Sequence, residues 1–563
     1  MNNLYLFLLV FLLYWQLVIF LNRRGILNKY NITAYGPILM IRTQRGQEFL
    51  DRLAVHKGFW RLFADAGLPA MLIGMLVMFL LILFIDYSMI TSFQSQTVPQ
   101  AGKFHEPRNI FLIPGINEFI PLTWGIIALI ITLVVHEFSH AILCKVEGIR
   151  VKSMGLLLAI VPIGGFAEPD EEQLLGKERN SGEQEEEEIQ PKKLATRQER
   201  VRVLTAGVMA NFVTAVIAFI LFFSLLGSLY PVSDITVVQT IPGYPAEDAG
   251  IKPNMIITSL NGIPVTSAQD FLVSTQKLEP GTQTTFGVVE NGTKKEITLI
   301  TSESKEIVTG VRIFDVIENT PADAAGIKPG MVMVKINDTD LTGLDDFVKF
   351  MGSTWAGQEI EVHMMSNTSE NATLQVFSVK LDKHPYDPAA TKGFLGVSYA
   401  PEGYTSYSVG VSIAQFPATN FLNGLKAIPS MLNGATGWLI LFSLPLMGGP
   451  DGEIFTGFTG MFTSYYENTG WASSLGTEIF WILTLLLWVG WMNFYVGLFN
   501  CLPAVPLDGG HVFRDVMTST LSRIMGNGEK VERISNAIVA VFAVLILMSL
   551  IFVIIAPFIA YGF

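Results

Sequence analysis

Long apolar segments alternate with polar ones along the chain, and their lengths indicate membrane-spanning helices. A helix needs about 20 apolar residues to cross a bilayer. Six segments approach or exceed this length, at residues 4–21, 68–89, 121–144, 203–229, 480–499 and 534–560. A weaker apolar segment lies at residues 431–447. The pattern predicts a polytopic α-helical membrane protein with about six spans, interrupted by a water-soluble block at residues 231–400.

Basic residues predict the orientation of these spans, because Lys and Arg collect on the cytoplasmic side of a membrane. Residues 22–65 and the loop after the third span are rich in Lys and Arg, so we expect both to be cytoplasmic. The soluble block is then external. Residues 448–478 contain no Lys or Arg, whereas residues 514–533 contain four. This alternation makes residues 431–447 a re-entrant or interfacial segment rather than a crossing.

Composition agrees with a membrane protein. Half of the 563 residues are hydrophobic, 15% are charged and the mean hydropathy is +0.43, whereas soluble domains carry about 25% charged residues. The net charge of −12 argues against a nucleic-acid partner, since phosphate binding needs concentrated Lys and Arg. Two cysteines cannot form a disulfide framework. The Glu-rich stretch at residues 168–199 is expected to be a disordered cytoplasmic loop.

The third span carries candidate chemistry in the sequence His136-Glu137-Phe138-Ser139-His140. Residues four apart share one face of a helix, so the two imidazoles can hold one metal ion. Glu137 is then placed to take a proton from a bound water. Ionisable side chains inside a membrane segment are unfavourable and usually functional. The alternative is a buried His/Glu cluster that neighbouring helices satisfy.

A catalytic zinc ion usually has three protein ligands, so two histidines leave one to be found. Asp508 lies just beyond the fifth span, in the sequence Asn500-Cys-Leu-Pro-Ala-Val-Pro-Leu-Asp508-Gly-Gly-His511. The prolines and glycines break the helix, which membrane proteins tolerate only where backbone is buried in protein or lines a wet cavity. Cys144, four residues after His140, is the alternative third ligand.

An internal repeat organises the soluble block. Residues 245–257 align with residues 321–333 at a constant offset of 76, through a shared Gly-Ile-Lys-Pro turn. Each copy has a β-rich stretch, a short helix, this turn and another strand. The pattern resembles circularly permuted PDZ domains of membrane-linked proteases. The resemblance implies a groove for an extended peptide or a chain end, or a size filter, and a spacer role is the alternative.

The H-E-x-x-H span followed by N-x-x-P and L-D-G on a later span resembles the site-2 protease family of intramembrane zinc metalloproteases. The segments Thr205-Ala-Gly-Val-Met-Ala-Asn211-Phe and Gly448-Gly449-Pro450 resemble parts of that family, and residues 148–168 resemble its membrane-dipping β-hairpin. The likeness covers most of residues 110–520. The first two spans are additional to those of the smallest bacterial members.

The resemblance implies one role for each matching residue. His136, His140 and Asp508 would be the zinc ligands, and Glu137 the acid and base. Asp508 is preferred to Cys144 because an acid from a facing span closes the coordination sphere and leaves one position to water.

Other matching residues would contact the substrate. Asn500 would donate hydrogen bonds to the substrate backbone or to a developing oxyanion, unless it only packs between helices. The expected substrate-binding residues are Asn211, which packing or hairpin support would equally explain, and Val151, Ser153 and Gly155, which would hold the substrate extended.

The implied function is zinc-dependent cleavage of peptide bonds within the membrane span of another protein. The tandem PDZ block would recognise or exclude the external part of that substrate. The substrate would already be shortened on its external side. The enzyme would reside in a plasma membrane, with its active site toward the cytoplasm. Three alternatives are a non-catalytic PDZ scaffold, a membrane-anchored metalloprotease acting on soluble substrates, and a metal transporter.

These assignments divide the chain into six parts. They are an N-terminal membrane region (1–120), a first catalytic membrane block (121–230), PDZ domain 1 (231–302), PDZ domain 2 (303–400), a second catalytic membrane block (401–533) and a C-terminal span (534–563).

Overall fold

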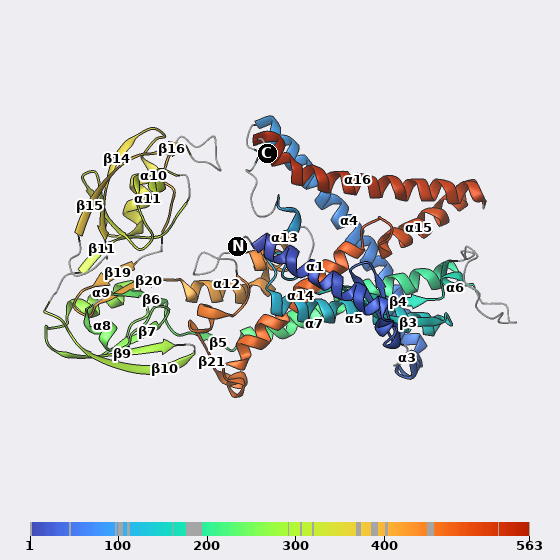
Figure 1. Ribbon diagram of the computed structural model, residues 1–563, viewed down its shortest axis with the longest axis horizontal. Coiled ribbons are helices and arrows are strands. Elements are labelled where there is room, and N and C mark those ends of the chain that lie inside the picture. The colour runs from blue at the N-terminus through green and yellow to red at the C-terminus, as the bar shows by residue number, and fades with distance from the viewer. Residues whose placement is uncertain are drawn as a thin grey trace. The chain divides into compact units, whose positions relative to one another are not determined.

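The structure is a computed structural model, and its elements form two compact units (Figure 1). The first unit contains Met1–Gln94, Ala101–Phe222 and Leu485–Phe563, and the second contains Ser95–Gln100 and Phe223–Thr484. The described residues are 3–43, 47–95, 98, 105–109, 113–159, 161–175, 194–241, 243–290, 292–303, 307–317, 320–366, 373–383, 392–399, 403–446, 455–526 and 528–561. Most of the expected acidic loop, residues 176–193, and Gly448-Gly449-Pro450 lie outside them.

Long apolar helices dominate the first unit, because a helix satisfies its backbone polar groups internally where water is absent. Five helices in the described part of the chain are long and apolar enough to cross a membrane, namely α4 (Lys57–Ser95), α5 (Leu122–Glu147), α7 (Arg197–Leu226), α14 (Glu478–Asn500) and α16 (Glu529–Tyr561). The other α-helices described in the first unit are α1 (Asn3–Arg23), α2 (Ile26–Lys29), α3 (Gln47–Ala54), α6 (Glu171–Leu175) and α15 (Asp508–Met525). The expected polytopic helical architecture is confirmed.

The number of spans stays a prediction. The expected span at residues 4–21 falls in α1, a helix of 21 residues that is apolar over most of its length. The expected re-entrant segment falls on α13 (Ala435–Ser443) and the short 3-10 helix Leu444–Leu446. These form a short apolar helix, Ala435–Leu446, which by length alone is not a full span.

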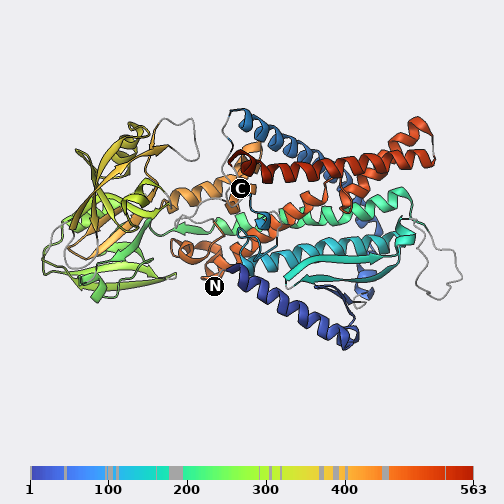
Figure 2. The same ribbon diagram turned by 45° about the horizontal axis from the view of Figure 1, so that its top comes forward.

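A four-stranded antiparallel sheet belongs to the first unit, in the order β1-β2-β3-β4. The strands are β1 (Ile32–Tyr35), β2 (Ile38–Thr43), β3 (Val151–Ala159) and β4 (Val161–Pro169). β3 and β4 confirm the expected hairpin, and β4 packs against α5 (Figure 2). β1 and β2 come from the basic segment at residues 22–65, for which the charge pattern predicted only a cytoplasmic position. Because β2 pairs with Met154–Leu158, β3 has a neighbouring strand on both sides.

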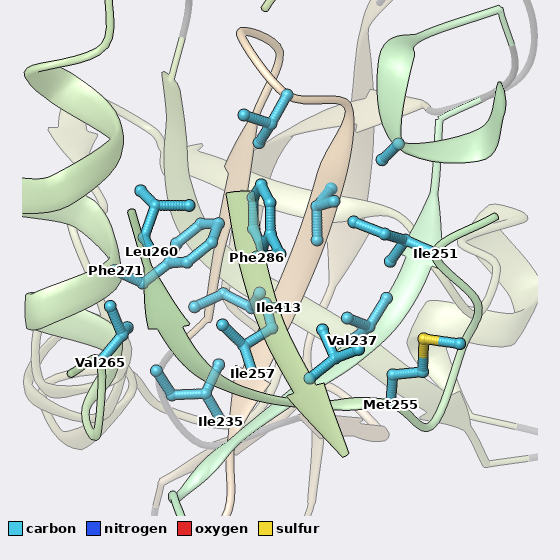
Figure 3. Close-up of a cluster of buried hydrophobic side chains, with 14 of the residues drawn as sticks. Ile235, Val237, Ile251, Met255, Ile257, Leu260, Val265, Phe271, Phe286 and Ile413 are labelled. Carbon is cyan, nitrogen blue, oxygen red and sulfur yellow. The ribbon is translucent and has the colours of Figure 1, made fainter. Parts of the chain in front are cut away.

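The second unit contains two small α+β lobes with separate cores. Lobe 1 encloses a cluster that includes Ile235, Val237, Phe271, Phe286 and Ile413 (Figure 3). Its elements are β6 (Ile235–Thr240), α8 (Pro245–Asp248), β7 (Ile256–Leu260), β8 (Ile263–Pro264), α9 (Ala268–Gln276), β9 (Gln283–Glu290), β10 (Thr293–Ile300), β19 (Gly403–Ser406) and β20 (Val411–Gln415).

Lobe 2 repeats this arrangement around a core that includes Ile313, Phe347 and Val362. Its elements are β11 (Ile307–Val316), α10 (Pro321–Ala325), β12 (Val332–Ile336), β13 (Thr339–Asp340), α11 (Leu344–Gly352), β14 (Glu359–Ser366), β15 (Thr373–Lys380), β16 (Asp382–Lys383), β17 (Gly393–Phe394) and β18 (Val397–Tyr399).

Lobe 2 is inserted into lobe 1. One antiparallel sheet runs through both lobes in the order β10-β9-β7-β6-β20-β19-β11-β12-β14-β15. β19 and β20 follow lobe 2 in the sequence, yet Val409, Val411 and Ile413 belong to the core of lobe 1. The expected domain limits stay predictions, and the strand pairing adds residues 403–415 to lobe 1.

The rest of the second unit connects the lobes to apolar helices. β5 (Leu229–Pro231) pairs with β21 (Tyr466–Asn468), and α12 (Ala418–Met431) follows β20. Asp234 Oδ1 accepts hydrogen bonds from the backbone N–H and the hydroxyl of Thr419, both at 3.1 Å. Asp234 thereby satisfies a free N–H in the first turn of α12, which has no side-chain cap of its own.

Candidate metal centre

The two histidines of the third expected span face each other on α5. His136 and His140 are separated by one helical turn, and their Nε2 atoms lie 3.1 Å apart. His136 is buried at 6% exposure. α5 continues to Glu147, and Gly148 ends it in the left-handed conformation (φ 78°). The metal-binding motif therefore lies well inside a regular helix, as its spacing predicted.

Asp508 reaches the histidines from the N-terminus of α15. Its Oδ2 lies 3.2 Å from Nε2 of His136 and 3.2 Å from Nε2 of His140. The first turn of a helix favours a carboxylate, because its free N–H groups carry partial positive charge. Gly509 and Gly510 allow this turn to pack closely, since a Cβ at Gly509 would lie 2.5 Å from the carbonyl of Cys501. In the L-D-G-G sequence, Asp508 therefore supplies the carboxylate, and the two glycines let the first turn of α15 pack closely against the preceding backbone.

A backbone carbonyl fixes the proton of His140. His140 Nδ1 lies 2.7 Å from the carbonyl oxygen of Val203 on α7. A carbonyl oxygen can only accept, so Nδ1 carries the hydrogen and Nε2 presents its lone pair. This arrangement is typical of metal-binding histidines, whose second ring nitrogen donates to a fixed acceptor.

Asn211 plays the corresponding part for His136. The side-chain nitrogen of Asn211 is placed 3.2 Å from His136 Nδ1, and its Oδ1 is buried with no hydrogen-bond partner in the described part of the chain. The two ends of an amide are assigned from their hydrogen bonds, so they can be exchanged. Exchanging them lets Oδ1 accept from Nδ1–H of His136. The imidazole N–H is then paired, and Nε2 of His136 also presents a lone pair.

The resulting donor set fits a cation. Two imidazole lone pairs and one carboxylate oxygen converge at separations of 3.1–3.2 Å, and such acceptors repel each other without a positive charge between them. Tetrahedral zinc with bonds of about 2.0–2.1 Å would separate its ligand atoms by about 3.3 Å. Two nitrogens and one carboxylate oxygen are also a common catalytic zinc set. His136, His140 and Asp508 therefore form a candidate zinc site.

Gly207 on α7 leaves the space that the imidazoles occupy. A Cβ at this position would lie 2.4 Å from His140 Nε2 and 2.8 Å from a ring carbon of His136. In the sequence, Gly207 belongs to the segment at residues 205–212, which resembles part of the site-2 protease family, but no function is predicted for the glycine itself. A glycine inside a long apolar helix is the signal that could have identified it, because glycine there often marks close packing.

Ion pairs join α4, α5, α7 and α15, and in the Arg200–Asp515 pair both side chains are largely buried. Arg200 on α7 binds both carboxylate oxygens of Asp515 on α15, at 2.7 and 3.0 Å. Arg202 binds Asp65 on α4 in the same two-point manner, at 2.7 and 3.0 Å. Glu147 at the end of α5 accepts from Arg61 and Arg202. In the sequence these arginines indicate only the cytoplasmic side of the membrane.

The remaining expected site residues lie outside this cluster. Glu137 is partly buried and interacts electrostatically with His140. The side-chain nitrogen of Asn500 donates to the Val496 carbonyl at 3.1 Å, within α14. Cys144 is buried in an apolar cluster and is not part of the convergent donor set. His511 lies in the first turns of α15. The substrate roles of Asn500 and Asn211 stay predictions.

Val151, Ser153 and Gly155 of the hairpin make most of their described contacts with the sheet itself and its neighbours. Gly155 pairs with Arg42 of β2 and with Phe166 of β4. The Ser153 hydroxyl donates to Glu168 at 2.5 Å, and the Val151 carbonyl accepts from Gln47 at 3.3 Å. Their expected role in holding a substrate is not tested by these contacts.

A protein-family model described as Peptidase family M50 matches residues 124–546, a stretch that contains all three candidate ligands. Several proteins are similar to this chain over parts of their sequences. An uncharacterized protein of Methanocaldococcus jannaschii, MJ0971, is 29% identical over 266 residues, which are 47% of this chain and 63% of that protein.

Two named proteases are also similar. Zinc metalloprotease RasP of Shouchella clausii is 27% identical over 219 residues, covering 38% of this chain and 42% of RasP. The regulator of sigma E protease of Haemophilus influenzae is 24% identical over 445 residues, covering 69% of this chain and 88% of that protein. The match thus spans less than two thirds of MJ0971 and of RasP.

Proposed function

Because the chain belongs to Peptidase family M50, we propose that it is a zinc-dependent endopeptidase that cleaves within or next to the membrane spans of other proteins. The expected membership in the site-2 protease family is thereby confirmed. The observation that carries the proposal is the convergence of His136 and His140 with Asp508, from helices far apart in the sequence, beside a glutamate on the first of these helices.

Each of these residues has a defined task in peptide hydrolysis. His136, His140 and Asp508 would hold zinc, which when bound supplies Lewis acidity toward a water and a carbonyl oxygen. Glu137 takes the proton from the attacking water and returns it to the amine that leaves. Val203 and Asn211 act through the histidines, because they fix which ring nitrogen carries the hydrogen.

A substrate span must unwind before it can be cleaved, because a helix hides its peptide bonds. The four-stranded sheet offers a way to hold it extended. β3 pairs with β2 and β4, so a substrate strand would add to an edge strand, β1 or β4. β4 is favoured because it packs against α5, the helix that carries the two histidines. Val151, Ser153 and Gly155 lie on β3, so they would stabilise the edge strand by pairing with it and would not pair with the substrate directly.

The soluble lobes would select the substrate. Their resemblance to tandem PDZ domains supports recognition or exclusion of the external part of a membrane protein that has already been shortened. The distribution of Lys and Arg supports an external position for the lobes and a cytoplasmic position for the active site, in a plasma membrane.

Two measurements on the detergent-solubilised full chain test the proposal. We expect about one zinc per chain, lost in Asp508→Ala and retained in the matched control Cys144→Ala. We expect cleavage of a quenched synthetic peptide of about 20 apolar residues by the wild type. Glu137→Gln should abolish this cleavage while zinc is retained.

The outcomes separate the proposal from its alternatives. Zinc that survives Asp508→Ala would exclude this ligand set. Cleavage that survives Glu137→Gln would exclude the glutamate as the base. A wild type without zinc after reconstitution would favour a non-catalytic scaffold, and zinc without cleavage by the wild type would favour metal transport.

A further inference from the structure

The apolar helices α4 and α16 lie side by side and run in the same direction. The rings of Phe79 and Phe542 have centroids 5.8 Å apart, and those of Phe93 and Phe552 have centroids 6.3 Å apart. The C-terminal ends of both helices lie together in Figure 1. In the described part of the chain, α4 and α16 are the least buried of the five long apolar helices, with 22% and 11% of their most apolar stretches buried against 44–61% for the others. Most of their surface is therefore left for lipid or for another membrane protein.

A carboxylate lies in the α4–α16 seam, which we define by Asp86, Ser549 and the two phenylalanine pairs. The Ser549 hydroxyl donates to Asp86 Oδ1 at 2.7 Å. Asp86 is the only Asp, Glu, Lys, Arg or His in residues 68–95. Ser549 lies eleven residues before the end of the apolar segment 534–560, which is about 16 Å along a helix. The carboxylate is therefore placed within the apolar part of this helix pair and not at its end.

Ser549 satisfies only part of this carboxylate. A carboxylate has two oxygens with about four lone-pair positions, and in the described part of the chain Ser549 is the one hydrogen-bond or ion-pair partner of Asp86. The basic residues of both helices lie near the opposite, N-terminal ends, namely Lys57, Arg61, Lys530 and Arg533. Acidic side chains in membrane segments usually pair with basic or other polar groups. A cation that matches Asp86 has therefore to come from outside these two helices.

We infer that the α4–α16 seam binds a membrane-spanning helix of another protein, with a Lys or Arg level with Asp86. The cation pairs with the second oxygen of Asp86, while the apolar surface of the partner packs against both helices. Leu83 and Ile90 on α4 and Leu545 on α16 are each about half exposed and offer that apolar contact. A second copy of this chain cannot supply the cation from a span, because its long apolar segments contain no Lys or Arg.

Binding of a synthetic membrane peptide to the full chain in detergent micelles tests the inference. The probe has a core of about 20 apolar residues with one Lys between its middle and its end. The control peptide has Leu at the position of that Lys, and fluorescence anisotropy of each labelled peptide measures its binding. The wild type should bind the Lys peptide at least about tenfold more tightly than the Leu peptide, because a close charge pair at an interface strengthens binding by that much or more.

Two variants of the chain separate the charge from the packing. Asp86→Asn keeps an oxygen that can accept from Ser549 but removes the charge, so it should bind the two peptides equally. Ser549→Ala is the matched control, because it breaks the same contact and leaves the carboxylate in place. This control should still prefer the Lys peptide. A cooperative thermal unfolding transition in each variant shows that the protein is folded.

Each other result would overturn the inference. Equal binding of the two peptides by the wild type would mean that the seam holds no site for a cation. A preference for Lys that survives Asp86→Asn, or is lost in Ser549→Ala, would assign it to a group other than the carboxylate. Self-association of the wild type that Asp86→Asn abolishes would make a second copy the occupant. None of these results involves zinc or peptide hydrolysis, so the inference and the proposed activity can fail independently.

Discussion

At the scale of single residues, the candidate metal centre needs a glycine at position 207, because a larger side chain there would overlap the two imidazoles. Gly207 on α7 lies against both imidazoles, and the neighbouring turn supplies the Val203 carbonyl that fixes His140. Ligand geometry in metal sites is commonly set by such surrounding contacts, whose loss lowers affinity about 10- to 100-fold.

Gly207→Ala should therefore lower zinc affinity at least about tenfold, because the new methyl group would lie where the imidazoles meet. Competition with a chelating dye measures this in the purified protein. Gly424→Ala is the matched control, since Gly424 is also inside a helix but a methyl group added there would have no atom within 4 Å. The control should bind zinc normally and gain about 0.5–1 kcal/mol of stability. Unchanged zinc affinity in Gly207→Ala would contradict the packing described.

The cluster of candidate ligands could be predicted from sequence because their side chains carry recognisable chemistry at a recognisable spacing. His136 and His140 are one helical turn apart, and Asp508 interrupts an apolar region. The Val203 carbonyl and the space at Gly207 could not be assigned, because a backbone oxygen and a missing side chain leave no chemical signature. The three candidate ligands lie together in the structure. Their binding of zinc and the substrate roles of Asn500, Val151, Ser153 and Gly155 stay predictions.

At the scale of elements, α7 supports all three ligands from one face. Arg200, Val203, Gly207 and Asn211 recur at intervals of three and four residues, which places them on one side of a helix. Val203, Gly207 and Asn211 contact the histidines. Arg200 reaches Asp515, which lies two turns after Asp508 on α15. The Arg200–Asp515 pair thus ties the helix of the third ligand to the helix that orients the first two.

Asp515→Asn should lower zinc affinity about tenfold or more, because α15 would no longer be held against α7. Asp65→Asn is the matched control. It breaks an equally short two-point pair with Arg202, but α4 carries no metal ligand. Isothermal titration with zinc compares the two, and thermal unfolding of the metal-free proteins reports their stability.

A purely structural role predicts something different. Both substitutions would then lower the unfolding temperature and leave zinc affinity alone. Asp515→Glu should restore part of the affinity if the ion pair positions Asp508. Equal zinc affinities in Asp515→Asn and Asp65→Asn would exclude the positioning role.

In the four-stranded sheet of the first unit, only two of the strands could be predicted from the sequence. The hairpin β3–β4 was expected, but β1 and β2 were not. The segment at residues 22–65 is marked by Arg and Lys, which indicate a membrane side and not a fold. Its strands are short, and β2 pairs with β3, more than a hundred residues later in the sequence. Local sequence patterns do not specify such distant partners.

At the scale of the whole molecule, the family and the helical membrane architecture follow from the sequence, whereas the limits of the soluble lobes do not. The repeat aligned residues 245–257 with residues 321–333 and so suggested two domains in series. Strands β19 and β20 instead return to lobe 1 after lobe 2 is complete. A linear repeat identifies similar pieces but does not show which distant strand closes each piece.

Because lobe 2 is inserted into lobe 1, the two lobes are completed in a fixed order during synthesis on the ribosome. When residue 400 has emerged from the exit tunnel, lobe 2 has all its strands, whereas the core of lobe 1 still lacks Val409, Val411 and Ile413. The usual N-to-C order of folding during synthesis should therefore be reversed for this pair. In nascent chains stalled so that residue 400 is exposed, brief proteolysis should spare lobe 2 and cut lobe 1. In chains exposed to residue 420 both should resist, and protection of lobe 1 at the earlier point would show that it folds without its closing strands.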